Sequence, residues 1–90
     1  MKHFFTGEII SGELSPDKSE FTVTEIKNIH TQSIWNENQL REMYDFLTKV
    51  KNSGEDSLII STGTFPVLIN RIEIEKLHQE LQAILSNGTV

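Results

Sequence analysis

Apolar residues recur at helical spacing in two stretches of the chain. In residues 36–54, one helical face would carry Leu40, Met43, Tyr44, Leu47 and Val50. In residues 71–86, the matching face would carry Ile74, Leu77, Leu81, Ile84 and Leu85. Spacing by three and four residues is typical of an amphipathic helix with one buried stripe. The pattern therefore predicts two helices, each with an apolar face and a polar face.

Both predicted helices carry start signals of the same kind. Asn36 and Asn70 occupy cap positions, and each is followed three residues later by a capping-box partner, Gln39 or Glu73. Gly54 supplies a left-handed stop for the first helix. The two caps are 34 residues apart and the apolar stripes align at that offset. This indicates either an internal ββα duplication or two helices of equal length that follow the same capping rules.

The remaining apolar segments are short and rich in aromatic and β-branched residues, which is typical of strands. Strands are predicted over residues 2–10, 20–30, 57–60 and 65–69. The segment 11–19 is dense in turn-forming residues and predicts a long hairpin loop. Pro66 cannot donate a backbone hydrogen bond, so we expect it at a sheet edge or at the start of a strand.

The sequence thus predicts one α+β domain over residues 1–90, in the order ββαββα, with a mostly antiparallel four-stranded sheet packed by two amphipathic helices. The runs Leu58-Ile59-Ile60 and Val67-Leu68-Ile69 do not alternate between apolar and polar residues, so both faces of these strands are expected to be buried. Two arrangements satisfy this expectation. Either a second chain covers the face away from the helices, or the chain covers it alone, with helices on opposite faces or with a strongly twisted sheet.

Charge and composition narrow the function classes. The 90 residues carry a formal charge of −5 and include no cysteine, which excludes disulfides, thiol catalysis and cysteine-based metal sites. The excess of acidic over basic residues argues against nucleic-acid binding, because such binding needs Lys and Arg to neutralise phosphates. The N-terminal ten residues lack the apolar run of a signal peptide. No stretch has a membrane span's composition. We therefore expect a cytoplasmic protein without membrane contact.

Candidate residues for chemistry are few. His3, His30 and His78 lie far apart in the sequence, so no metal site and no cofactor is predicted. In a ligand-binding protein, the residues to examine are His30, Thr62, Thr64 and His78. The segment 61–64 is small and hydroxyl-rich, but it has no nearby Lys and is explained by a hairpin turn.

A second group of candidates suits contacts with another protein. Aromatic residues dominate the energetics of interfaces. Trp35 and Tyr44 would serve as anchors if they are exposed, although their spacing also fits core positions. Phe4 and His78 complete the set of candidate interface residues.

Three functional hypotheses follow. The first is a small binding or regulatory module that acts through protein–protein contacts as a homodimer, with no enzymatic activity. The second is a small enzyme or ligand-binding domain with a pocket between sheet and helices. The third, a narrower form of the first, is an inhibitor encoded by a phage or mobile element, suggested by a short, acidic chain without recognisable motifs.

Overall fold

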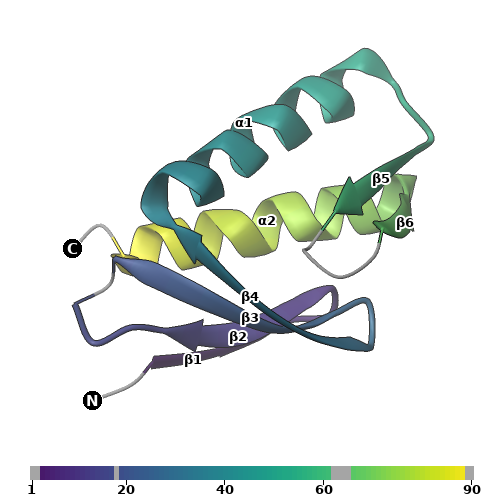
Figure 1. Cartoon of the computed structure of the whole chain (residues 1–90). Coiled ribbons are helices and arrows are strands. Elements are labelled where there is room, and N and C mark those ends of the chain that lie inside the picture. Colours follow the sequence, from purple (N-terminus) through teal and green to yellow (C-terminus); the bar gives the residue numbers. More distant parts are fainter. Residues whose placement is uncertain (1–2, 18, 62–65, 89–90) are drawn as a thin grey trace.

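The computed structural model describes residues 3–17, 19–61 and 66–88 (Figure 1). In chain order, the elements of this part are β1 (His3–Thr6), β2 (Ile10–Leu14), β3 (Glu20–Ile26), β4 (Ile29–Asn36), α1 (Glu37–Ser53), β5 (Ser57–Ser61), β6 (Pro66–Asn70) and α2 (Arg71–Gly88). The predicted α+β class, the order of strands followed by a helix in each half and the antiparallel four-stranded sheet are confirmed, although four strands and not two precede α1.

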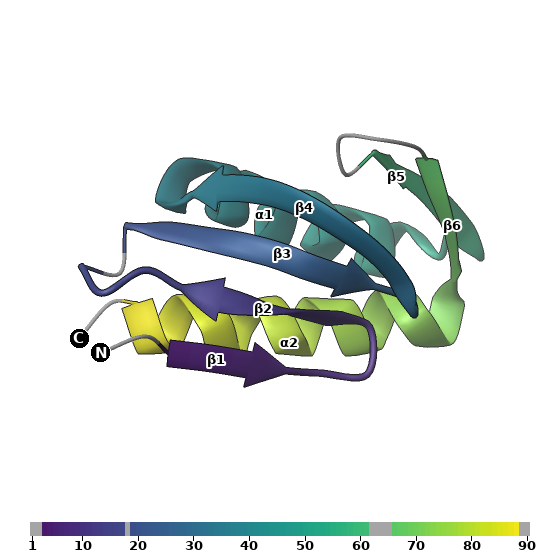
Figure 2. The same ribbon diagram turned by 60° about the horizontal axis from the view of Figure 1, so that its bottom comes forward.

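The four-stranded sheet is an antiparallel meander in the order β1-β2-β3-β4, and β5 and β6 pair separately as a two-stranded sheet. All four strands of the larger sheet therefore come from the segment before α1. Figure 2 shows both helices on one face of this sheet, with the other face open. The arrangement with helices on opposite faces of the sheet, which the sequence allowed, is thus excluded.

The N-terminal strands differ from the prediction in their boundaries. The predicted loop 11–19 contains most of β2, and the predicted strand 20–30 is broken by a tight turn at Lys27 and Asn28. Both turn residues have positive φ, 50° and 64°, as a two-residue hairpin turn of type I′ requires. Asn tolerates this conformation, but Lys rarely adopts it, so the sequence signal for the turn is weak.

Gly12 shows why a residue typical of turns lies inside β2. A Cβ atom at this position would meet the ring of Phe21 at 2.7 Å and the carbonyl oxygen of Thr22 at 2.1 Å. The phenyl ring of Phe21, which is fully buried, thus lies directly against the glycine. A side chain here would displace the largest buried residue of the core.

The two apolar runs of the second hairpin are buried on one face only. Ile60, Val67 and Ile69 are buried, whereas Ile59 is 64% and Leu68 is 58% exposed. The expectation that both faces of these strands are buried was wrong, because β5 and β6 form an outlying hairpin with the helices on one side only. These runs therefore mark an exposed apolar surface.

The open face of the four-stranded sheet is largely polar. Its exposed apolar residues, Phe4 and Ile34, stand at opposite ends of one cross-strand row, with Glu13 and Thr22 between them. Alternation of this kind is typical of a sheet face in contact with water. A second copy is therefore not needed to cover this face.

The two helix starts form as predicted. The Oδ1 atom of Asn36 accepts the N–H of Gln39 at 2.9 Å, and the side chain of Gln39 accepts the N–H of Asn36 at 2.9 Å. Asn70 and Glu73 make the same reciprocal pair at 2.9 and 2.8 Å. Gly54 ends α1 in the left-handed conformation, with φ 81°.

Side chains from distant segments connect these units. The Glu80 carboxylate of α2 accepts the backbone N–H groups of Glu8, Ile9 and Ile10 in the β1–β2 connection, at 2.8, 3.1 and 2.9 Å. The ammonium group of Lys76 forms an ion pair with Glu8. These contacts attach the edge of the larger sheet to α2.

Candidate functional site

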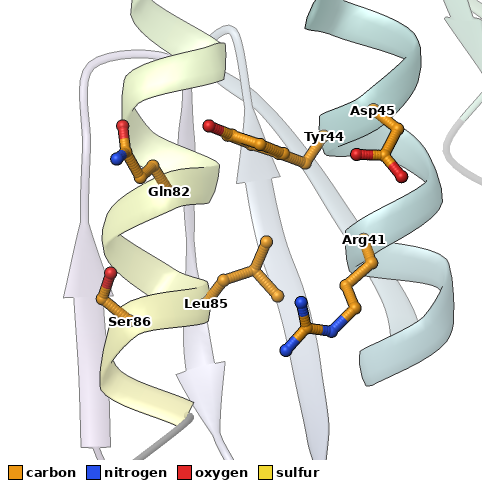
Figure 3. Close-up of a pocket in the computed structure, with 6 residues that line it drawn as sticks. All are labelled: Arg41, Tyr44, Asp45, Gln82, Leu85 and Ser86. Carbon is orange, nitrogen blue, oxygen red and sulfur yellow. The ribbon is translucent and has the colours of Figure 1, made fainter.

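A hollow lies between the two helices. It is an open cleft of about 470 Å³, and its lining residues are Arg41, Tyr44, Asp45, Gln82, Leu85 and Ser86. Figure 3 shows Tyr44 and Arg41 reaching from α1 toward α2, with Leu85 pointing back between them. A guanidinium, a phenol and an amide thus surround an apolar floor, a combination suited to a small polar ligand.

Tyr44 is held in place by a contact with His78 of α2. The two rings are stacked, with centroids 4.4 Å apart and an angle of 16° between their planes. The hydroxyl of Thr48 donates to the carbonyl of Tyr44 at 2.9 Å and lies 2.8 Å from Nε2 of His78. Because the single hydroxyl proton goes to the carbonyl, this arrangement assigns a proton to Nε2. Nε2 of His78 then donates to the hydroxyl oxygen of Thr48, as it can in either charge state of the ring.

The surroundings of His78 disfavour its charged form. Partial burial lowers the pKa of His78 below its ordinary value of 6.5, and the positive charge of Lys51 lowers it further. Arg41 is oriented by Glu37, one turn earlier on α1, at 3.4 Å. The charge of the cleft is therefore carried by Arg41 and Asp45, beside a neutral histidine.

The structure brings together two of the four candidate interface residues, Tyr44 and His78. Trp35 is half-buried and lines a different hollow, on the other side of α1. Phe4 is 76% exposed, on the open face of the four-stranded sheet. Tyr44 and His78 thus share one region, whereas Trp35 and Phe4 each lie on a different part of the surface.

The candidate ligand residues do not converge on the cleft. The side chain of His30 is 91% exposed, and its imidazole lies 3.8 Å from the carboxylate of Glu25 on the neighbouring strand. It lines none of the described hollows. Thr62 and Thr64 lie outside the described residues.

Sequence reasoning missed a second surface, around the β5–β6 hairpin. Phe46 of α1 is 48% exposed and lines two hollows of about 290 and 340 Å³. One hollow reaches Ser61, and the other reaches Ser57 and Leu58. The runs 58–60 and 67–69 carry the available signal, but their lack of alternation predicts burial on both faces and not exposure.

Among residues 3–17, 19–61 and 66–88, no group of three or more His, Cys, Asp or Glu side chains could hold a metal ion. No helix in the same ranges has the length and apolar character needed to cross a membrane. No family model, curated protein or solved structure significantly matches the chain.

Proposed function

We propose that this chain is a small, non-enzymatic binding module that acts through protein–protein contacts and forms a homodimer. The observation that carries the proposal is the pair Ile59 and Leu68, which lie directly opposite each other on the outer face of β5–β6 and are both more than half exposed. Side chains in such positions contact one another. They form a joined apolar patch, and such patches are typical of contact surfaces.

The composition of the hairpin supports the same conclusion. Residues 57–61 and 66–70 include no Asp, Glu, Lys or Arg, although charged residues make up 23% of the chain. Depletion of charge is typical of the centre of a protein interface. Phe46, which is half-exposed beside β5, adds an aromatic residue of the kind that dominates binding energy.

Sedimentation equilibrium of the purified chain tests the proposal. We expect the average mass to rise from 10.3 kDa toward twice that value as the concentration increases from about 10 μM to about 1 mM, a range that covers weak association. A mass that stays at the monomer value throughout this range would refute the homodimer.

The cleft between the helices supports a second candidate function, the binding of a small ligand. The observation that favours it is the set of polar groups converging on Leu85, with Tyr44 fixed by its stack on His78. Thermal-shift measurements with a panel of small carboxylates would test it, with Arg41→Ala as the matched variant. A shift that is equal in the variant would assign the binding to another place.

A further inference from the structure

The two outer edges of the β5–β6 hairpin are unlike each other. On β6, the carbonyl oxygen of Leu68 accepts the ammonium group of Lys27 at 2.8 Å. The N–H of Asn70 donates to Glu73 at 2.8 Å, and Pro66 has no N–H. Residues 66, 68 and 70 alternate along the strand, so all three direct their backbone groups away from β5. This outer edge is closed to another strand.

The edge of β5 is open. Ser57, Ile59 and Ser61 are the register partners of the three outward-directed residues of β6. In an antiparallel pair, residues opposite each other direct their backbone groups the same way, either both inward or both outward. The N–H and C=O groups of these three residues therefore point away from β6. Within the described part of the chain, no other strand pairs with β5.

Proteins usually protect such an edge with a charge, a proline or a bulge. The segment 57–61 has none of these. By contrast, β4, an outer strand of the larger sheet, contains an irregularity opposite the segment from Val23 to Glu25. Space also exists beside β5, because the hollows of about 290 and 340 Å³, both lined by Phe46, reach Ser61 at one end of the strand and Ser57 at the other. Within the described residues, β5 therefore offers an unprotected strand edge with room next to it.

We propose that β5 pairs with β5 of a second copy of this chain, antiparallel and centred on Ile59. This inference rests on the proposed homodimer and identifies the surface that forms it. The sequence of β5, Ser-Leu-Ile-Ile-Ser, reads nearly the same in both directions. Two-fold pairing about Ile59 places Ser57 opposite Ser61 of the other copy and Leu58 opposite Ile60. An isologous interface requires this kind of self-complementary surface.

The same register also gives hydrogen-bond partners to the outward-directed backbone groups of β5. It sets the outward-directed residues 57, 59 and 61 of one copy against 61, 59 and 57 of the other, so their N–H and C=O groups meet as hydrogen-bonded pairs. No charged side chain lies within the pairing, despite the net charge of −5. Five residues and Phe46 make a small contact, and interfaces below about 1,200 Å² are typically transient. We therefore expect a dissociation constant in the micromolar range or weaker.

Cysteine cross-linking tests the register, since the natural chain contains no cysteine. In the proposed dimer, the two copies of Ile59 form a hydrogen-bonded pair, with Cα atoms about 5.5 Å apart, within the range that a disulfide spans. The two copies of Leu68 would be three strand spacings, about 14 Å, apart. Under mild oxidation, Ile59→Cys should therefore form a disulfide dimer much faster than the similarly exposed Leu68→Cys. Equal rates would overturn the proposal.

A charge variant separates this inference from the proposed function. Ile59→Lys would place two ammonium groups against each other, and like charges that face each other across an interface repel, so self-association should weaken by more than about tenfold. The matched control is Ile34→Lys, because Ile34 is 57% exposed on the open face of the larger sheet. If the natural chain dimerises and Ile34→Lys abolishes dimerisation while Ile59→Lys does not, the inference is overturned and the homodimer stands. A natural chain that is monomeric at all concentrations refutes both. Circular dichroism checks that each variant is folded.

Discussion

The carboxylate of Glu80 in α2 accepts the backbone N–H of Ile10, 70 residues away along the chain, at 2.9 Å. It also accepts the N–H groups of Glu8 and Ile9. The connection between β1 and β2 thus has its backbone donors satisfied by one side chain from the last helix. Gly7 permits this approach, since a Cβ there would lie 2.4 Å from Oε1 of Glu80.

Removing this carboxylate should loosen the edge of the sheet. Glu80→Ala leaves three backbone donors without their charged acceptor, and hydrogen bonds to charged groups contribute roughly 1.5–3 kcal/mol. Because the site is only partly buried, we expect a loss of about 2 kcal/mol in the free energy of unfolding, at the lower end of that range. Urea denaturation measures it, with Gln79→Ala, an exposed neighbour on α2, as the control. A loss equal to that of the control would contradict this role.

The histidine of the interhelical cluster predicts a dependence on pH. Burial and Lys51 hold the pKa of His78 below its ordinary value of 6.5 in the folded chain, so the unfolded chain binds the proton more readily. The stabilisation from the neutral ring is therefore complete above the unfolded pKa and is lost as the pH falls through 6.5 toward the lower folded pKa. We expect the melting temperature to fall between about pH 7.5 and pH 5.5.

The variant His78→Gln isolates this contribution. It retains a polar side chain beside Thr48 but has no group that titrates in this range. We expect its melting temperature to vary less with pH than that of the natural chain. Similar slopes for the two proteins would show that another group causes the dependence.

The capping side chain of α1 should contribute a measurable part of the stability. Asn36→Ala removes the acceptor for the N–H of Gln39, and loss of such a cap costs about 1 kcal/mol. Asn36→Asp keeps an acceptor and places a negative charge at the helix N-terminus, which is favourable. We expect the alanine variant to be less stable than the natural chain and the aspartate variant to be close to it in urea denaturation. Equal losses in both variants would indicate that the amide group acts elsewhere.

The features that sequence reasoning predicted well are local. The caps Asn36 and Asn70 and the apolar stripes depend on residues three or four positions apart, and both were present in the structure as expected. The boundaries of β2 were missed because Gly12 is typical of a turn, and only the distant ring of Phe21 explains its place in a strand. The contacts that form the caps lie within one helical turn, so the spacing of residues in the sequence reveals them. The contact between Gly12 and Phe21 lies between two strands, and residue spacing does not reveal it.

The site was less predictable for the same reason. Tyr44 and His78 stand eight residues after their respective caps, so each position could be placed on its helix. Their stacking depends on how α1 and α2 pack, which neither stripe determines. The exposed pair Ile59 and Leu68 was misjudged because an apolar run looks the same whether its second face is covered by the fold or left open for a partner.

Lys27 provides the last prediction, because it connects the β3–β4 turn to the second hairpin. Its ammonium group donates to the carbonyl oxygen of Leu68 and lies 3.1 Å from the carboxylate of Glu73. Burial opposes ionisation of Glu73, but the N–H of Asn70 and the charge of Lys27 outweigh it and lower the pKa of this carboxyl group. Lys27→Met should therefore weaken the attachment of the hairpin by about 1 kcal/mol, since the pair is partly exposed and screened by solvent.

Amide hydrogen exchange would show this effect locally. The N–H groups of Val67 and Ile69 point toward β5 in the observed register, and their exchange should be about fivefold faster in the variant, as a loss of 1 kcal/mol implies. Lys49→Met, which removes an exposed charge from α1, should leave these two amides unchanged. If Lys27→Met changes them no more than the control, then Pro66 and the pairing with β5 hold β6 in place without Lys27. Loss of Lys27 also leaves the carbonyl oxygen of Leu68 on the outer edge of β6 without its donor. This edge could then pair with a strand of another copy, so a rise in self-association should accompany the faster exchange.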